Sequence, residues 1–402
     1  MRWPRVPLGE VAQIVGGSTP RRGEEKLWGP GHFWATPTDL PMPGNGILEL
    51  RTTKETITDV GLRSSSTNLL PVGAVLFSTR ATIGKLAIAQ VPVATNQGFN
   101  NFIVGSAIQN HFLAYALQYF TPDITRLAGS TTFKEVSRSS LRGFRIPVPP
   151  LSEQHRIVEL LDEADRLRKL RREADAKAAR ILPVLFLKMF GDSSTNPLGL
   201  RKKPLGKLIE VKSGNFLPAK DMVSKGGFPV YGGNGVNGYH DTFMFEDRKV
   251  VLGRVGAYCG AIHYSEPKSW ITDNALYVSE KLEPLDDYYL VAALEYANLN
   301  QYAGRAGQPL ISGSRIYPVE ILVPPEKLQS NFSESTAKLR TLDDTKSIAS
   351  ARLDHLWNTL MSRAFSGQLT TKWREAHMQE LLAEMQDQVR LLDLPMPEML
   401  PG

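Results

Sequence analysis

The chain has 402 residues, of which 42% are apolar, 8% aromatic and 22% charged, a composition typical of folded globular proteins and a length too great for a single core. Its only cysteine, Cys259, excludes an internal disulfide and a thiolate-rich zinc site, and we interpret it as a buried small side chain. The net charge is +6, and residues 1–150 carry the whole excess, with 15 basic against 9 acidic side chains. Such a basic balance suits nucleic acid as a partner.

The first ten residues lack the apolar core of a signal peptide. No stretch of about 18 uncharged apolar residues follows anywhere in the sequence. We therefore expect no membrane association and a cytoplasmic location.

An internal duplication organises the sequence. The segment PLGEVAQIVGG at residues 7–17 matches PLGKLIEVKSG at residues 204–214. Farther along, residues 75–88 resemble 250–262, and residues 95–97 parallel 272–274. Short β-branched and aromatic runs, at residues 74–78, 250–252 and 321–323, alternate with Gly, Asn and Pro, which predicts short strands joined by long loops.

A long helix is predicted after each of two diprolines, over residues 151–192 and 326–370. Pro and Gly are nearly absent there, and apolar residues recur at steps of three and four. The two apolar stripes share one phase at a constant offset of 175, so that Leu167 of the first matches Leu342 of the second and Ile181 matches Leu356. This shared phase predicts an antiparallel pair or coiled coil. The alternative is that each stripe covers only its own globular domain.

Local signals mark the ends of these helices. Ser152 and Glu153 are candidate caps for the first helix, and Pro183 is expected to kink it near its end. Gly191 and Gly367 are expected just past the two helix ends. A helix of about 40 residues is about 60 Å long, so the pair is expected to hold two domains at a fixed distance.

Little in the sequence indicates catalysis. The diprolines read VPPL and VPPE, so neither matches the Asn/Asp/Ser-Pro-Pro-aromatic tetrapeptide of adenine methylation. Residues 233–238 satisfy GxGxxG, but residues 239–243 are not a helix start, so we predict a turn-rich loop. Glu266, Lys268 and Asp241 resemble a nuclease metal triad, a pattern too common to indicate one. The histidines show no metal-ligand spacing, and we predict no catalytic residue and no metal site.

Several of these pieces together resemble a known family. They are the duplicated domain and helix, the PLG openings, IPVPPLSEQHRI at the start of the first helix, the FPVYGGNGVNGYHD loop, and the endings KMFGD and RAFSGQL. Over residues 1–370 the chain resembles the specificity subunit of type I restriction-modification systems. The resemblance implies an α+β fold with two mixed α/β target recognition domains, at residues 1–150 and 193–325. They would be separated by two long helices, 151–192 and 326–370, forming an antiparallel coiled coil with a pseudo-twofold internal repeat.

The resemblance also implies a function. Each domain would read one half of a bipartite, asymmetric sequence in double-stranded DNA, and the chain would scaffold two methyltransferase subunits and restriction/translocase subunits. This chain would be non-catalytic and bind no cofactor, with S-adenosylmethionine, ATP and magnesium on the partner subunits. The assembled complex would be a site-specific DNA methyltransferase and endonuclease that serves in phage defence.

DNA-binding residues are predicted in the loops, because Arg and Lys contact phosphates while Arg, Asn, Gln and Thr read base edges. The candidates in the first domain are Thr19, Arg21, Arg22, Arg80, Lys85, Asn96, Gln97, Lys134 and Arg138. The candidates in the second domain are Lys220, Asn234, Asn237, Tyr239, Arg254, Asp273, Asn274, Arg305 and Arg315. The alternative for each is a structural role, in which Asn satisfies turn geometry and Arg braces a loop from within.

Two further questions stay open at this point. The C-terminal helical tail, residues 371–402, has apolar residues near one helical face, so it either binds a partner or folds back onto the central helices. The rival functions are a structural coiled-coil adaptor without a DNA role and a self-sufficient DNA-modifying enzyme.

Overall fold

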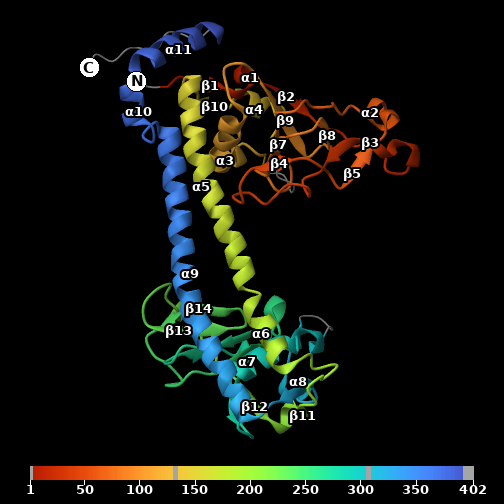
Figure 1. Ribbon diagram of the computed structural model, residues 1–402, viewed down its shortest axis with the longest axis vertical. Helices are drawn as coiled ribbons and strands as arrows, with labels where there is room; N and C mark the ends of the chain where they lie inside the picture. The colour runs from red at the N-terminus through yellow and green to blue at the C-terminus, as the bar shows by residue number, and fades with distance from the viewer. Residues whose placement is uncertain (1–2, 130–134, 305–308, 393–402) are drawn as a thin grey trace. The chain divides into compact units, whose positions relative to one another are not determined.

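In a computed structural model, the chain folds into two compact units, each with its own apolar core (Figure 1). The structure describes residues 3–129, 135–304 and 309–392, without the side chains of residues 340–348. Unit 1 comprises residues up to 171 and those from 350 onward, and unit 2 comprises residues 172–349. Both units combine helices with sheets, so the fold class is α+β.

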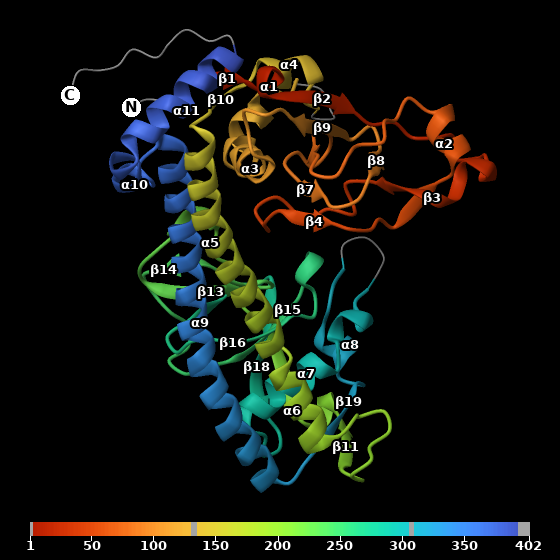
Figure 2. The ribbon, with the colours of Figure 1, turned by 45° about the horizontal axis from the view of Figure 1, so that its top comes forward.

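The described residues of unit 1 form three sheets. The largest has the strand order β2 (Ala12–Gly16), β9 (Phe99–Val104), β6 (Val75–Ser78), β7 (Leu86–Ala89) and β4 (Leu48–Leu50). The second has the order β5 (Glu55–Ile57), β3 (Trp28–Ala35) and β8 (Val93–Thr95), and the third pairs β1 (Arg5–Pro7) with β10 (Arg145–Pro147). Its short helices are α1 (Leu8–Val11), η1 (Glu25–Leu27), α2 (Asp59–Ser64) and α4 (Arg138–Gly143). In Figure 2, β3 and α2 lie at the end of this unit farthest from α5 (Leu151–Ala178).

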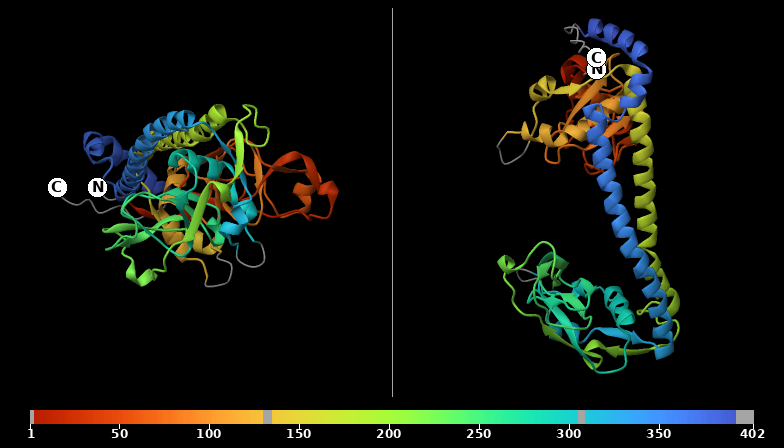
Figure 3. Two further views of the ribbon diagram at one scale, coloured as in Figure 1. Left: turned by 90° about the horizontal axis from the view of Figure 1, so that it is seen from below. Right: turned by 90° about the vertical axis from the view of Figure 1, so that its left-hand side faces the viewer.

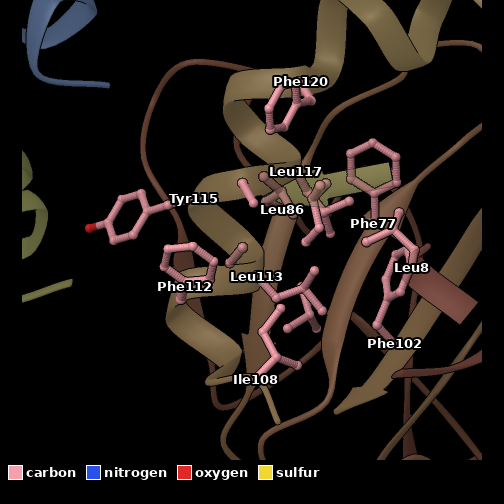
Figure 4. Close-up of a cluster of buried hydrophobic side chains, with 14 of the residues drawn as sticks. Leu8, Phe77, Leu86, Phe102, Ile108, Phe112, Leu113, Tyr115, Leu117 and Phe120 are labelled. Atoms are coloured by element: carbon pink, nitrogen blue, oxygen red, sulfur yellow. The ribbon is translucent and has the colours of Figure 1, made fainter. Parts of the chain in front are cut away.

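The core of unit 1 forms where α3 (Asn110–Arg126) packs on β6 and β7 (Figure 4). Both strands are buried along their whole length, so they show continuous apolar runs rather than alternation. On α3, Leu113, Leu117 and Phe120 are buried at the four- and three-residue spacing of one helix face. Each such Phe or Leu contributes roughly 1.5–3 kcal/mol relative to an exposed position.

In unit 2, too, the part of the chain that the structure describes forms three sheets. The largest has the order β12 (Ile209–Ser213), β18 (Ala275–Lys281), β15 (Val250–Gly253) and β16 (Ile262–Tyr264). The second has the order β14 (Gly235–His240), β13 (Phe228–Gly232) and β17 (Trp270–Ile271), and the third pairs β11 (Arg201–Pro204) with β19 (Glu320–Val323). Its helical segments are α6 (Ile181–Phe190), η2 (Leu205–Lys207), η3 (Ala219–Asp221), η4 (Gly256–Tyr258), α7 (Asp287–Tyr296), η5 (Leu299–Tyr302) and α8 (Gly313–Ile316).

The strand order of unit 2 repeats that of unit 1. The order β12-β18-β15-β16 matches β2-β9-β6-β7, and β11-β19 matches β1-β10. Strand β13 is antiparallel to β14 and parallel to β17, as β3 is antiparallel to β5 and parallel to β8. The sequence duplication therefore corresponds to a duplication of strand order. The strands predicted at residues 74–78, 250–252 and 321–323 are confirmed as β6, β15 and β19.

The helix predicted over 151–192 is interrupted. It forms α5 and α6, which are separated by Ala179 and Arg180. The interruption includes Ala179, four residues before Pro183, so the predicted kink near the helix end is confirmed. Proline lacks an N–H and its ring clashes with the carbonyl group four residues earlier, whereas the first turn of a helix tolerates it. The second long helix is α9 (Glu326–Ser366). Gly191 and Gly367 follow α6 and α9 with φ of 75° and 80°, as predicted.

The buried face of the long helices follows the predicted stripe only near the helix starts, at Ile157 and at the matching Phe332, and departs from it farther along. Leu167 and Leu356 are 48% and 55% exposed, whereas Trp357 and Met361 are buried in the core of unit 1. In this unit the helices therefore bury the face turned toward their own domain. The two helices also contact each other there, because the Arg168 guanidinium lies 3.3 Å from the carboxylate of Asp354 and over the ring of Trp357.

The described part of the C-terminal tail folds back onto unit 1. Helices α10 (Thr371–Ala376) and α11 (Met378–Leu391) lie at the end of this unit where α5 begins (Figure 3). The buried carboxylate of Glu153 accepts hydrogen bonds from Trp3, Thr370 and Arg374. Glu153 is therefore not a helix cap, which corrects the prediction.

Ser152 is not a cap either, because its backbone N–H and hydroxyl donate to the carboxylate of Glu384 on α11. That carboxylate satisfies a backbone donor in the first turn of α5, the place where a negative charge is favoured. The cap thus comes from the C-terminal tail. No helix within the described ranges is long and apolar enough to cross a membrane.

Candidate nucleic-acid interface

Three loops of unit 1 emerge at one end of its five-stranded sheet. The sheet register places Gly16 beside Asn100 and Ser78 beside Phe99, so the loops at 17–24, 79–85 and 95–98 leave the same edge. Backbone hydrogen bonds tie them together: Ser18 donates to the Thr95 carbonyl at 2.9 Å and Thr79 to the Gly98 carbonyl at 2.9 Å. Loops anchored on a rigid sheet in this way are a common site for ligand-binding residues.

Unit 2 repeats this loop scaffold bond for bond. The backbone N–H of Arg254 donates to the Asn274 carbonyl at 3.0 Å, where Thr79 donates to Gly98 in unit 1. The Gly260 N–H donates to the Gly253 carbonyl at 2.8 Å, where Gly84 donates to Ser78 at 3.0 Å. The Thr79 carbonyl accepts a hydrogen bond from the Val136 N–H, and the Arg254 carbonyl accepts one from the Ile311 N–H. Val136 and Ile311 are themselves separated by the repeat offset of 175.

Two matched glycines make the close approach of these loops possible. A Cβ atom on Gly17 would lie 2.2 Å from the Asn96 carbonyl oxygen, and one on Gly214 would lie 2.2 Å from the Ile271 carbonyl oxygen. Any side chain at either position would push the two loops apart. These glycines correspond to each other in the duplicated sequence.

Arg22 is the most strongly anchored candidate in unit 1. Its guanidinium forms a two-pronged ion pair with Glu55 and lies 4.1 Å and 5.0 Å from the ring centroids of Trp28 and Trp34. The hydrogen bond from Arg22 lowers the pKa of the Glu55 carboxyl, and the Glu55 carboxylate raises the pKa of Arg22. Arg22 thus presents a fixed positive charge, supported by cation–π contacts.

The other candidate DNA-binding residues of unit 1 are either exposed or hydrogen-bonded within the loops. Thr19 donates a hydrogen bond to Gln97, which joins two of the three loops. Arg80 is an exposed cation 3.9 Å from Glu135, and the exposed Arg21 pairs with Glu24 at 3.4 Å.

Arg138, Asn96 and Lys85 complete the described set in unit 1. Arg138 lies against Gly16 and Asn100 at the same sheet edge. Asn96 braces the loop, because its side-chain oxygen accepts from the Gly98 N–H at 2.9 Å. Lys85 points inward and donates to the Pro37 carbonyl at 2.6 Å, so its structural alternative holds in this conformation.

The unit 2 candidates occupy three places. Arg254 donates to the Ser213 hydroxyl at 3.0 Å and the Asp273 carbonyl at 3.4 Å, which brings it beside Asp273 and Asn274. Asn234 and Asn237 lie in the β13–β14 hairpin, and Tyr239 lies on β14 opposite Pro229. Lys220 lies exposed in η3, and Arg315 lies on α8 against Gly304.

Two candidates, Lys134 and Arg305, lie outside the described residues. Sequence reasoning missed Trp28 and Trp34, which hold Arg22, and Phe216 and Tyr258, which are 72% and 57% exposed in unit 2 beside the loop scaffold. An exposed aromatic residue next to a Gly/Asn turn, as in the sequence SGNF, is a signal that would have indicated Phe216.

The other motifs have structural explanations. The GxGxxG segment forms the turn of the β13–β14 hairpin at residues 233–234 and the start of β14. The predicted turn is confirmed, but residues 235–238 are strand and not loop. Glu266 pairs with Arg248 and Lys268 pairs with Glu246. Cys259 is buried as predicted, and burial raises the pKa of its thiol. Among the residues that the structure describes, no three His, Cys, Asp or Glu side chains come together as ligands for a metal ion.

Comparisons with known proteins agree with this arrangement. The family model for the type I restriction modification DNA specificity domain matches residues 2–178 and 197–354. The type I restriction enzyme MjaIX specificity subunit of Methanocaldococcus jannaschii is 28% identical over 237 residues, 55% of this chain and about half, 54%, of that protein. The EcoprrI specificity subunit of Escherichia coli is 24% identical over 362 residues, 85% of this chain and 88% of that protein.

A solved structure shares the fold. The crystal structure of the type I restriction-modification S subunit from M. genitalium aligns over 91% of this chain and 96% of that chain, with a TM-score of 0.60 and 17% identity. The chain belongs to the type I restriction-modification DNA specificity family. Members of this family are specificity subunits, so its loops are candidates for DNA sequence recognition.

Proposed function

We propose that this chain is the DNA sequence-recognition subunit of a type I restriction-modification complex and that each unit reads one half of a bipartite, asymmetric site. The main support is that one loop scaffold occurs twice with different side chains. Arg254 and Asn274 of unit 2 occupy the places of Thr79 and Gly98 in unit 1. Because side-chain identity decides which base edges are contacted, the same scaffold with different side chains reads two different half-sites.

The long helices would set the distance between the half-sites. In this proposal α5 and α9 form an antiparallel coiled coil with pseudo-twofold symmetry, and their length fixes the number of unread base pairs. The contacts of Arg168 with Asp354 and Trp357 support antiparallel pairing within unit 1. Glu153, near the start of α5, supports it as well, because it binds Thr370 and Arg374 beyond the end of α9.

Chemistry would be carried out by other chains of the complex. Two methyltransferase subunits and restriction/translocase subunits would assemble on this chain in the cytoplasm, with S-adenosylmethionine, ATP and magnesium bound to them. A methyltransferase must take its target adenine out of the base stack, so the recognition subunit has to hold DNA in a deformable state. The Arg and Lys side chains at the loop ends would supply the phosphate contacts.

Genome-wide mapping of methylated adenines, with and without this gene, tests the proposal. We expect methylation at one two-part sequence to vanish when the gene is deleted. An unchanged methylation pattern would refute it. Turnover by the purified chain alone with DNA, magnesium and methyl donor would reveal a self-sufficient enzyme. Strict dependence of DNA binding on both halves of one sequence would eliminate the adaptor.

A further inference from the structure

The two units differ at one equivalent place, the surface where a long helix begins. In unit 1 the Gln154 carboxamide donates to the carbonyls of Ala107 and Pro149 at 3.0 and 2.8 Å. Gln388 on α11 donates to the same two carbonyls, each at 3.1 Å. Helix α11 therefore covers this surface, and a pocket of about 570 Å³ lies between it and the start of α5.

Unit 2 contains the same local scaffold at the repeat offset of 175. Gln329 replaces Gln154, and its carboxamide nitrogen donates to the Pro324 carbonyl at 2.8 Å. Its oxygen accepts from the Asp286 N–H at 2.9 Å, as the oxygen of Gln154 accepts from Gln109 at 2.8 Å. The first turn of the helix is thus attached to its domain in the same way in both units.

The covering helix has no counterpart among the described residues of unit 2. Two pockets, of about 490 and 470 Å³, lie on this surface, and both are lined by Pro284, Glu326 and Gln329. Glu326 and Gln329 correspond to Leu151 and Gln154 at the offset of 175. Pro284 takes the place of Ala107, because each lies two residues before the N–H that donates to the glutamine oxygen. We call this region, residues 199–201, 281–286 and 323–330, the unit 2 helix-start surface.

We propose that the unit 2 helix-start surface binds an amphipathic helix of a partner polypeptide, which directs a carboxamide side chain at the Pro284 and Pro324 carbonyls. This inference rests on the scaffolding role proposed above. Helix α11 shows which shape and chemistry this scaffold accepts. Within the ranges that the structure describes, α11 is the one such helix, and it is used in unit 1, where Gln388 is 7% exposed and its hydrogen bonds are buried. The occupant of unit 2 is therefore another chain.

The lining residues indicate how the partner helix differs from the chain's own tail. Leu328 and Leu200 replace Glu153 and Trp3, and both pack against the unit 2 core. The buried arginine that Glu153 requires in unit 1 would be left unpaired beside these leucines. The partner is expected to place an apolar residue there.

The test uses the full-length chain and a fluorescent synthetic peptide of residues 378–392, which carries Gln388 and lacks Arg374. We expect saturable binding with one peptide per chain by fluorescence anisotropy. The substitution Ser330→Arg fills the surface, because Ser330 is exposed and lines the pocket, and it is expected to weaken binding at least tenfold. The matched control, Ser224→Arg, adds the same side chain to an exposed unit 2 loop and should leave binding unchanged.

A second peptide probes the carboxamide. Replacing Gln388 by Met in the peptide keeps its size and removes the donor, so affinity should fall roughly 2- to 10-fold, the range for one hydrogen bond. Absence of binding at millimolar peptide, or equal binding to Ser330→Arg, would overturn the proposal. So would a dimer of the chain that Ser330→Arg disrupts, because a second copy would then be the occupant.

The complex provides an independent readout. In hydrogen exchange of the full chain with its methyltransferase subunits, residues 281–286 and 326–330 should exchange more slowly on assembly. Sequence-specific DNA binding by Ser330→Arg should be unchanged. If the unmodified chain recognises a two-part DNA sequence but does not bind the peptide, this inference alone is rejected. If the unmodified chain does not recognise a two-part sequence, the proposed function is rejected.

Discussion

Gln154 and Gln388 donate hydrogen bonds to the same two carbonyl oxygens, those of Ala107 and Pro149. One glutamine lies at the start of α5 and the other on the last described helix, so the C-terminal tail is part of the core structure of unit 1. Next to this pair, the buried Glu153 carboxylate is held by Arg374 at 2.7 Å.

The substitution Arg374→Met is expected to destabilise unit 1 by about 3 kcal/mol. It leaves the Glu153 carboxylate buried without its cation, and breaking a buried ion pair from one side typically costs this much. Urea unfolding followed by tryptophan fluorescence measures the change. Arg390→Met is the matched control, because its pair with Asp387 is exposed and its loss should be nearly neutral. Equal stability of the two variants would contradict the assignment.

Removing the exposed Arg21 cation is expected to weaken binding to all DNA sequences alike. If its guanidinium contacts a phosphate, Arg21→Ala should reduce the slope of log K against log salt by about 1. Binding of the assembled complex across a salt series gives this slope. Arg156→Ala on α5, which removes another exposed and paired arginine, should leave it unaltered. An unchanged slope for Arg21→Ala would remove Arg21 from the interface.

The ion pair of Arg22 with Glu55 predicts a pH dependence of the loop at residues 17–24. Because Arg22 lowers the pKa of Glu55 below its ordinary 4.5, the pair stabilises the loop above about pH 4.5, and this is lost as the pH falls through the lowered pKa. Both groups are largely exposed, so the effect stays within about 1 kcal/mol.

Tryptophan fluorescence measures this change, because Arg22 lies over Trp28 and Trp34. The signal should change in acid in the unmodified chain and stay flat in Glu55→Gln. The same acid transition in both proteins would assign it to other groups.

Inserting four residues, about one helical turn, after Ala174 is expected to change the preferred spacing between the half-sites and to leave both half-sites unaltered. The insertion lengthens α5 without touching the loops of either unit. Selection of bound sequences from a random DNA library gives the spacing and the half-sites together. Ala174→Ser, at the same position without added length, is the control. An altered half-site would contradict modular recognition.

Local patterns were sufficient for much of the fold. The strands, the start of each long helix and the ends marked by Gly191 and Gly367 follow from residue periodicity and from the φ that glycine permits. The glycine pair Gly17 and Gly214 was found as a match in the sequence, although only the structure shows the carbonyls that each one accommodates.

Features that depend on distant contacts were not predictable in this way. Nothing local indicates that Glu153 is buried against Arg374 or that Lys85 turns inward to Pro37, because both partners are remote in sequence. The stripe at Leu356 was misassigned because Trp357, on the neighbouring face, fits the domain core instead. The candidate DNA contacts remain predictions for the same reason, since loop conformation decides which side chains reach a base.

The most direct test of the account is the sequence preference of the assembled complex before and after one substitution in unit 1. Gln97→Ala changes an exposed side chain that joins two of the three loops. In a random DNA library, the unmodified complex should select two different short motifs separated by a fixed number of unspecified base pairs, and the variant should relax one motif only. Selection of a single continuous motif, or relaxation of both halves together, would contradict recognition by two independent units.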